Sequence, residues 1–420
     1  MKRKPVWLHS AIIILLLVSV VVPLLGSVLR EKDFGIAFDA GGGGWSSDFA
    51  AHLTFAKAFW KGHAGYDVQS HLRITGARFG RPVEHALPFG YSPTMLWLLA
   101  PFCLLSPAVA FISWTLLDVA VIWWMTSPEW GVWIAAALFS PAAIACFKLG
   151  QTSFLTAAGL LFLMLRDLER YATGTRAPSL ASEWPDVIAL WALTAKPPLA
   201  LTAGIALVAE RRWRTVAWAL GLSVLTSAVL TPLLGTSWVY DYVHLMIHYD
   251  LQTADPAFVW SLKPQTMGNL RALLQVTVGF GDALASRWSS GAWLLALLSI
   301  VAVGWRRWLG PEGVWGGAML SYLLFCPHVT STEELHLVLV LALVAPASRT
   351  VPGAVRWPVV AMALAVLYLA PGFGYEGALR IPGVVVAKTL LVGLVCVYSL
   401  WCGEAFGRQT ANERMSKTCA

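Results

Sequence analysis

Long apolar runs, separated by short polar segments, repeat along the whole chain. The first, Val6–Leu29, contains no Asp, Glu, Lys or Arg. As a helix it would rise ~36 Å, enough to cross the ~30 Å of hydrocarbon in a bilayer. A run that lies in lipid must be helical, because lipid offers the backbone no hydrogen-bond partner. Further runs lie at roughly 91–106, 107–126, 130–147, 149–165, 185–209, 215–234, 288–305, 313–327, 335–348, 357–371 and 381–402.

The N-terminal run has two interpretations. Three basic residues at positions 2–4 precede it, as in a cleaved signal peptide. However, the run is long enough to span a bilayer, and it ends in the charged residues 30–32 and not in a small-residue cleavage site. We therefore expect a retained membrane anchor.

The composition excludes a soluble protein. Apolar residues make up 57% of the chain, and charged residues only 13%, about half of the ~25% usual for soluble domains. A single soluble core would not bury that much apolar surface. The six cysteines form no C-x-x-C pair, so neither a disulfide framework nor a zinc cage is indicated. We predict an all-α, polytopic membrane protein, one integral membrane domain over residues 1–420 with about 10–13 transmembrane or re-entrant helices.

Basic residues gather between the apolar runs, so the net charge of +7 does not indicate nucleic acid as a partner. Basic loops remain in the cytoplasm. This places both termini, including the tail 403–420, inside, and leaves 30–90 and 235–287 as two long outer loops. Within them, Asp48–Trp60 and Tyr240–Tyr249 predict helices that lie at the membrane surface. The basic clusters are Lys2–Lys4, Arg166/Arg170/Arg176, Arg211/Arg212/Arg214, Arg306/Arg307, Arg349/Arg356 and Arg408–Lys417.

Two regions break the alternation of inside and outside segments. The run 185–209 lies between two basic clusters that both belong inside, and Lys196-Pro197-Pro198 interrupts it. Proline removes a helix hydrogen bond and bends the chain, which predicts two short helices meeting in a bend within the membrane. One of the proline-containing runs in 91–165 is expected to be broken or re-entrant as well. Irregular backbone at membrane depth is tolerated where it lines a cavity, so these breaks indicate a functional site.

Asp48 is the candidate catalytic residue. It follows the first run, near the outer membrane surface, where a carboxylate is placed to act as a general base on a hydroxyl that arrives from the aqueous side. The alternative is structural, because Ser46-Ser47-Asp48 precedes a helical pattern and such residues commonly cap helices.

Four other polar residues interrupt apolar sequence: Tyr91, Lys148, Gln151 and Lys196. Polar groups at membrane depth are costly unless they face a cavity or a partner. Tyr91, in Tyr91-Ser92-Pro93, has the simpler interpretation of an aromatic anchor at the interface. For the two lysines, a functional role in a cavity and a structural role, by snorkelling or in an ion pair, explain the sequence equally well.

Neither a metal site nor a nucleotide site is indicated. His328, Glu333, Glu334 and His336 lie close in sequence, but the adjacent glutamates point in different directions on a helix, so we expect no metal. The sequence contains no Walker A loop, no G-x-G-x-x-G after a strand and no G-x-S-x-G.

The order of these elements resembles glycosyltransferase family 87, membrane enzymes of the GT-C class that include bacterial polyprenyl-phosphate-mannose-dependent mannosyltransferases. The resemblance extends from about Asp48 to Leu343. Its elements, in order, are Asp48-Phe49, Lys61-Gly62-x(3)-Tyr66-Asp67, Tyr91-Ser92-Pro93, Leu149-Gly150-Gln151, Lys196-Pro197-Pro198, Arg211-Arg212-Trp213-Arg214, Lys263-Pro264-Gln265 and Pro327-x(6)-Glu334-Leu335.

The resemblance implies a GT-C-like bundle in the bacterial cytoplasmic membrane, with the active site facing outside. It implies transfer of a mannose-like hexose or a pentose from a polyprenyl phosphate to a lipid-linked or envelope glycan, with Asp48 as base and inversion at the anomeric carbon. No cofactor is expected. A departing phosphate needs cations, and the candidates on outer segments are Lys263, Arg271 and His328, with Lys148 if the re-entrant segment places it outside. Gln151 and Tyr91 would line the cavity.

One departure and two alternatives accompany this resemblance. Relatives often have an aspartate or paired histidines where this chain has Glu333-Glu334, which affects the handling of the donor. A transporter or flippase of a lipid-linked glycan would depend on the intramembrane charges more than on Asp48. A non-catalytic scaffold for envelope polysaccharide assembly would tolerate Asp48→Asn.

Overall fold

The structure is a computed structural model. It describes residues 48–125, 140–173, 180–250, 267–344, 353–369 and 381–398, with gaps at 64, 80–81, 84–85 and 87, and the isolated positions 14, 18, 136 and 137. Every element within these ranges is a helix. This confirms the all-α prediction. The predicted anchor Val6–Leu29, apart from two positions, and the tail 403–420 lie outside the described residues.

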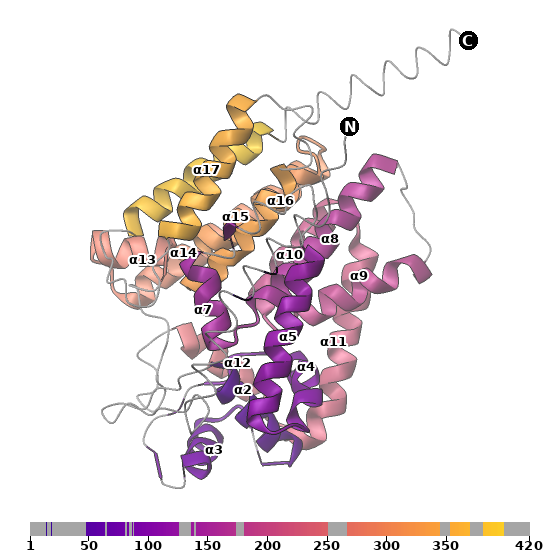
Figure 1. The fold of residues 1–420 in the computed structure, drawn as a ribbon, viewed down its shortest axis with the longest axis vertical. Helices are drawn as coiled ribbons and strands as arrows, with labels where there is room; N and C mark the ends of the chain where they lie inside the picture. The colour runs from indigo at the N-terminus through magenta and orange to yellow at the C-terminus, as the bar shows by residue number, and fades with distance from the viewer. Residues whose placement is uncertain are drawn as a thin grey trace.

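Short helices gather at one end of the molecule, the lower end in Figure 1. They are α2 (Asp48–Trp60), α3 (Val68–Phe79) and α12 (Trp238–Asp250). Aromatic side chains hold this end together: the Tyr66 ring lies 4.9 Å from Tyr242 and 6.5 Å from Trp238, centroid to centroid. The described parts of the two predicted outer loops therefore meet, and they contain helices.

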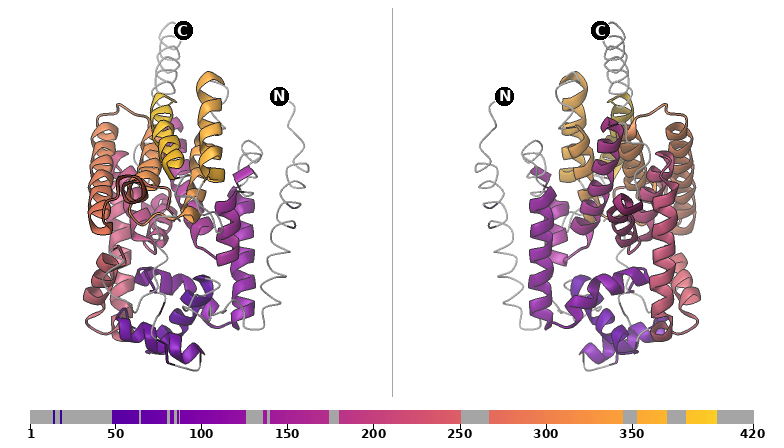
Figure 2. Two further views of the ribbon diagram at one scale, coloured as in Figure 1. Left: turned by 90° about the vertical axis from the view of Figure 1, so that its left-hand side faces the viewer. Right: turned by 90° about the vertical axis from the view of Figure 1, so that its right-hand side faces the viewer.

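Two long apolar helices, α5 (Pro107–Met125) and α11 (Trp213–Leu234), run from this end along the molecule (Figures 1 and 2). Among the described residues, four helices are long and apolar enough to cross a membrane: α5, α11, α14 (Asp282–Trp305) and Ile381–Tyr398. Their outer faces expose large apolar side chains, such as Val224 and Leu225 on α11 and Leu295 on α14. A continuous apolar surface of this kind is covered by lipid, which agrees with a polytopic membrane protein.

The predicted break in the run 185–209 is confirmed. α9 (Leu180–Leu193) ends just before Thr194, and α10 (Pro197–Ala209) starts with a proline at its first position, where a missing N–H costs nothing. A second break separates α7 (Pro141–Leu149) from α8 (Ser153–Thr173). Gly150 caps α7 in the left-handed conformation, with φ of 62°. With only nine residues, α7 is too short to span a bilayer.

A third short helix, α4 (Pro93–Cys103), has eleven residues and also cannot cross the membrane alone. Ser92 caps it by accepting a hydrogen bond from the backbone N–H of Thr94. The prediction that a run within 91–165 is broken or re-entrant is therefore satisfied at two places, α4 and the α7–α8 junction.

The C-terminal half builds a core around α15 (Pro311–Phe325), most of whose residues are buried. A 3-10 segment, η3 (Ser331–Leu337), follows and continues into α16 (Val338–Val344), and α17 (Gly353–Leu369) comes later in the chain. The short α13 (Leu270–Leu273) and η2 (Leu274–Val278) precede α14. The apolar run predicted to begin at residue 335 thus starts as 3-10 helix, because this segment carries buried charges that need fixed partners.

α2 has the predicted bounds and is packed against its neighbours, since none of its residues is fully exposed. Its position at the membrane surface stays a prediction. Phe49, Leu53, Phe55 and Phe59 are all buried, and they lie on more than one face of the helix. A helix that is apolar on several faces is buried by its neighbours, here mainly α4.

Candidate active site

Asp48 is the first residue of α2, and aromatic packing holds it in place. The Phe49 ring lies 5.8 Å from Phe111 and 5.0 Å from Trp114, both on α5. Gly150, between α7 and α8, approaches so closely that a Cβ there would lie 2.6 Å from the Phe49 Cβ. This contact places the N-terminus of α2 against the break in the membrane helices.

The Asp48 carboxylate is poised for proton transfer. Gln151 Nε2 donates a hydrogen bond to Asp48 Oδ2. Burial raises the pKa of Asp48 to about 6, although the positive charge of Lys196 opposes the rise. At neutral pH the group is therefore mostly ionised, and its proton affinity is higher than that of an exposed aspartate. Both properties suit a general base.

Two distant motifs, Tyr91-Ser92-Pro93 and Lys196-Pro197-Pro198, meet beside this carboxylate. Ser92 donates its backbone N–H to the Ala195 carbonyl at 3.1 Å, and its hydroxyl to the Thr194 carbonyl at 2.6 Å. The Lys196 Nζ lies 5.8 Å from the centroid of the Tyr91 ring. The Tyr91 hydroxyl lies 3.3 Å from Thr152 Oγ1, one residue beyond Gln151. The structure thus brings Asp48, Tyr91, Gln151 and Lys196 into one cluster.

Lys196 is also the centre of an ion pair. Its Nζ lies 2.9 Å from Glu333 Oε1, and both side chains are largely buried. The Tyr322 hydroxyl on α15 donates a hydrogen bond to Glu333 Oε2. Of the two interpretations that the sequence leaves open for Lys196, an ion pair is present, and the lysine faces the Asp48 cluster at the same time.

His52 belongs to this cluster and was not among the predicted residues. It lies four residues after Asp48 on α2, so both occupy the same helix face. Its ring is 4.7 Å from the Tyr91 ring and 5.6 Å from Phe89. Burial, reinforced by the Lys196 charge, lowers its pKa to about 3, so that the ring is neutral. The i, i+4 spacing from Asp48 is the sequence signal that points to it.

The glutamates of η3 serve different partners, as their adjacency predicts. Glu333 binds Lys196, whereas Glu334 pairs with the buried Lys388. His336 lies 2.9 Å from Thr156 Oγ1 through Nε2 and 2.7 Å from the Glu333 carbonyl through Nδ1. Across the part of the chain that the structure describes, no group of three His, Cys, Asp or Glu side chains is arranged to hold a metal.

The other predicted binding residues lie elsewhere or outside the description. Arg271 is fully buried on α13, with Nη2 2.6 Å from Asp282 Oδ1 and Nη1 3.1 Å from the Pro327 carbonyl. His328 is half-buried in the turn after α15. Lys148 lies in the last turn of α7, and its side chain, like all of Lys263, is outside the described residues.

Comparison with known proteins identifies the family. No curated protein matches this chain. The model of glycosyltransferase family 87 matches residues 89–329, a range that includes Tyr91, Gln151 and Lys196 and leaves Asp48 and Glu333 outside. This match confirms the resemblance seen in the sequence. Since it covers more than half of the 420 residues, the chain, a multi-helix membrane protein, belongs to glycosyltransferase family 87.

Proposed function

We propose that this glycosyltransferase moves a hexose or pentose from a polyprenyl-phosphate sugar to a lipid-linked or envelope glycan on the outer side of the bacterial cytoplasmic membrane. Asp48 is the general base. The observation that carries the proposal is a buried carboxylate with a pKa of about 6, held by Gln151 beside Lys196 and Tyr91. The neutral His52 completes this face of α2 without adding a competing charge.

The reaction is a single displacement. As the acceptor hydroxyl oxygen attacks the anomeric carbon, its proton passes to an Asp48 carboxylate oxygen. The bond between the anomeric carbon and the phosphate oxygen breaks, and the electron pair leaves with the polyprenyl phosphate. One in-line attack inverts the anomeric configuration. Burial of the base helps, because charges interact more strongly in a site that excludes water.

A cation must meet the charge that develops on the departing phosphate. Among the described side chains, Lys196 supplies the positive charge that influences the pKa of Asp48. We assign Lys196 the role of stabilising the departing phosphate. Lys263, His328 and Lys148 are further candidates on the basis of the sequence. Both Lys196 and Arg271 are ion-paired, to Glu333 and Asp282. Of the two, it is Lys196 that lies beside Tyr91 and acts on Asp48. Tyr91 and Gln151 line the space between base and phosphate.

The test is transfer of radiolabelled sugar from polyprenyl-phosphate donors (mannose, glucose and arabinose) to a membrane lipid extract. Purified wild type is compared with Asp48→Asn at matched protein amount. We expect wild type to transfer and the variant to lose activity by ~100-fold or more. Asp48→Asn removes a buried charge, so its melting temperature is expected to stay the same or rise. Equal transfer by both proteins would exclude Asp48 from the mechanism.

A second pair of variants separates the role of Lys196 from its ion pair. Lys196→Met leaves Glu333 buried without its partner, which costs about 3–5 kcal/mol in comparable cases. The double variant Lys196→Met/Glu333→Gln removes both charges and is expected to recover thermal stability but not transfer. Recovery of transfer together with stability would show that Lys196 is purely structural. No transfer by wild type with any donor would favour the transporter or the scaffold.

A further inference from the structure

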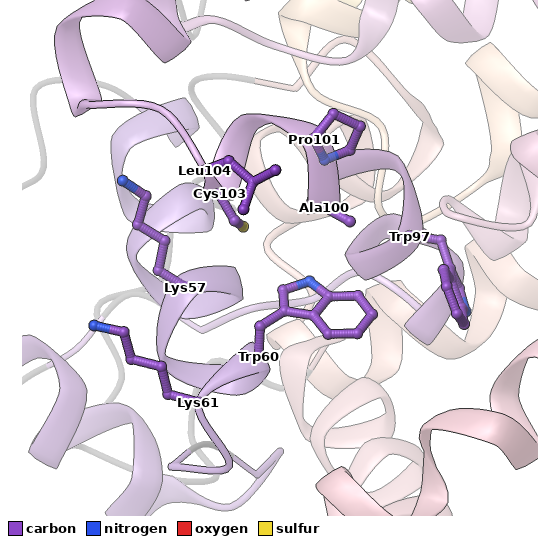
Figure 3. A pocket seen from close by; sticks show the side chains of 8 residues that line it. All are labelled: Lys57, Trp60, Lys61, Trp97, Ala100, Pro101, Cys103 and Leu104. Atoms are coloured by element: carbon purple, nitrogen blue, oxygen red, sulfur yellow. The ribbon is translucent and has the colours of Figure 1, made fainter.

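A groove of about 800 Å³ lies between the C-terminal end of α2 and the outer face of α4. Figure 3 shows its lining, with Lys57, Lys61 and Leu104 toward one side, Trp97 at the other, and Trp60 and Pro101 between them. Asp48 is at the opposite end of α2, nine residues from Lys57, or ~14 Å along the helix axis. The groove is therefore separate from the cluster around Asp48.

The tryptophans turn apolar surface into the groove. The indole N–H of Trp60 donates to the Leu96 carbonyl at 3.3 Å, and that of Trp97 to the Thr226 carbonyl at 3.2 Å. Since the polar edge of each ring is tied to the protein, the carbon faces remain for a ligand. Leu104, 89% exposed, adds apolar surface nearer to Lys57.

The lysines make the other end of the groove positive. Lys57 and Lys61 are spaced i, i+4 and so lie on the same side of the chain, and Figure 3 shows both side chains projecting in the same direction. Neither forms a salt bridge with any carboxylate in the described ranges. Lys57 donates one hydrogen bond, at 2.6 Å to the Leu105 carbonyl, and an ammonium has three donors. Burial and the nearby charges of Lys61 and Arg78 lower the pKa of Lys57.

We propose that this groove binds an anionic glycerophospholipid of the membrane, with its phosphate on Lys57 and Lys61, beside Leu104, and an acyl chain over Trp60 and Trp97. Tryptophan beside lysine is the composition of protein surface at headgroup depth, and each lysine near that surface attracts anionic lipid. The phosphate would relieve the repulsion between two unpaired cations. The apolar half of the groove has room for a hydrocarbon chain. A soluble anion would leave this apolar surface uncovered.

Native mass spectrometry tests this site on the full-length protein, released from micelles that contain phosphatidylglycerol or phosphatidylcholine. We expect wild type to retain phosphatidylglycerol preferentially. In Lys57→Gln/Lys61→Gln, its apparent affinity should fall ~20- to 30-fold, because each lysine contributes about fivefold. The control, Arg214→Gln/Arg306→Gln, removes the same charge from two exposed arginines elsewhere and should behave as wild type. Lys57→Arg/Lys61→Arg should retain the lipid.

A photo-crosslinker placed at Leu104 locates the ligand. The expected product is the full-length chain joined to one phospholipid. The proposal would be overturned if Lys57→Gln/Lys61→Gln and Arg214→Gln/Arg306→Gln retained phosphatidylglycerol equally. It would also be overturned if wild type retained phosphatidylcholine as well as phosphatidylglycerol. A crosslink to the polyprenyl-phosphate donor or to a second copy of the chain would overturn it too, by naming another occupant. Lipid retention is also measured in Asp48→Asn, which is expected to lose sugar transfer but to retain phosphatidylglycerol, so that the two proposals are tested separately.

Discussion

At the scale of single residues, the chemistry centres on how burial tunes Asp48 and its neighbours. The same desolvation raises the pKa of Asp48 to about 6 and lowers that of His52 to about 3. One residue therefore stays able to accept a proton near neutral pH, while the other stays neutral. Lys196 adds a fixed positive charge between them and Glu333.

The raised pKa of Asp48 predicts the pH dependence of transfer. A general base works only when ionised, so kcat/KM is expected to fall about tenfold per pH unit below pH ~6 and to level off above pH ~7. An acid whose pKa is higher in the folded state binds a proton more readily when folded, so Asp48 itself favours the folded state more at pH 5 than at pH 7. Loss of activity at pH 5 should therefore occur without a lower melting temperature from this group. A pH profile of kcat/KM without an inflection near 6 would contradict this assignment.

At the scale of elements, the site depends on breaks in helices. Tyr91 precedes α4, Gln151 lies between α7 and α8, and Lys196 lies between α9 and α10. Each break exposes backbone that needs partners, and the structure supplies them across elements, as Ser92 does for the turn at Thr194. Short helices that would be marginal alone are thus stabilised by the packing that builds the site.

Gly150 is the most constrained of these breaks. Gly150→Ala would place a side chain in the left-handed conformation, costing ~1–2 kcal/mol, and would push its Cβ against Phe49. We expect a lower melting temperature and at least about tenfold slower transfer, because the displaced residue is next to Asp48. Thermal unfolding and the transfer assay measure both effects.

The matched control is Gly221→Ala in α11, where an added Cβ meets no atom within 4 Å. It should leave transfer unchanged and the melting temperature equal or slightly higher, since alanine favours helix more than glycine does. If the two alanine variants behaved alike, the close approach of Gly150 to α2 would have no functional role.

At the scale of the whole molecule, the two ends differ in charge and in partners. α11 runs from Arg212, whose guanidinium binds Asp167 and Asp186 at 2.5 Å each, to the end where α12 contacts Tyr66. Its 22 residues rise ~33 Å, the thickness of a hydrocarbon core. The basic cluster and the α12 end are therefore expected on opposite sides of the membrane, and the Asp48 site, whose Thr194–Lys196 turn contacts Ser223 in the middle of α11, is expected to open toward the α12 side.

Labelling from outside the cell tests this orientation. Lys61→Cys and Arg214→Cys place thiols at exposed positions near the two ends. In intact cells a membrane-impermeant maleimide should label Lys61→Cys, and should label Arg214→Cys only after the membrane is permeabilised. The unsubstituted protein, with its native cysteines, gives the background. Labelling in the reverse order would place the Asp48 site in the cytoplasm.

Much of the fold was predictable because the signals are local. A run of apolar residues predicts a helix wherever it occurs, and Pro197 or Gly150 marks a break through its own backbone preferences. The bounds of α2 and the bend at Lys196 follow in this way. The burial of α2 did not, because its aromatic residues suit a membrane surface and a protein interior equally well.

Local patterns along the chain predict an all-helical membrane protein with a candidate base after the first run and polar motifs at breaks in later ones, and the resemblance of these motifs to family 87 implies a glycosyltransferase. These properties depend on composition, period and short motifs. The packing of the helices was needed to show that Lys196 pairs with Glu333, that His52 joins Asp48 and Tyr91, and that Arg271 is bound to Asp282. Such pairings join residues that are distant in sequence, or residues for which several partners of suitable charge are available. Which cation meets which carboxylate depends on how the helices pack, and no local pattern encodes that.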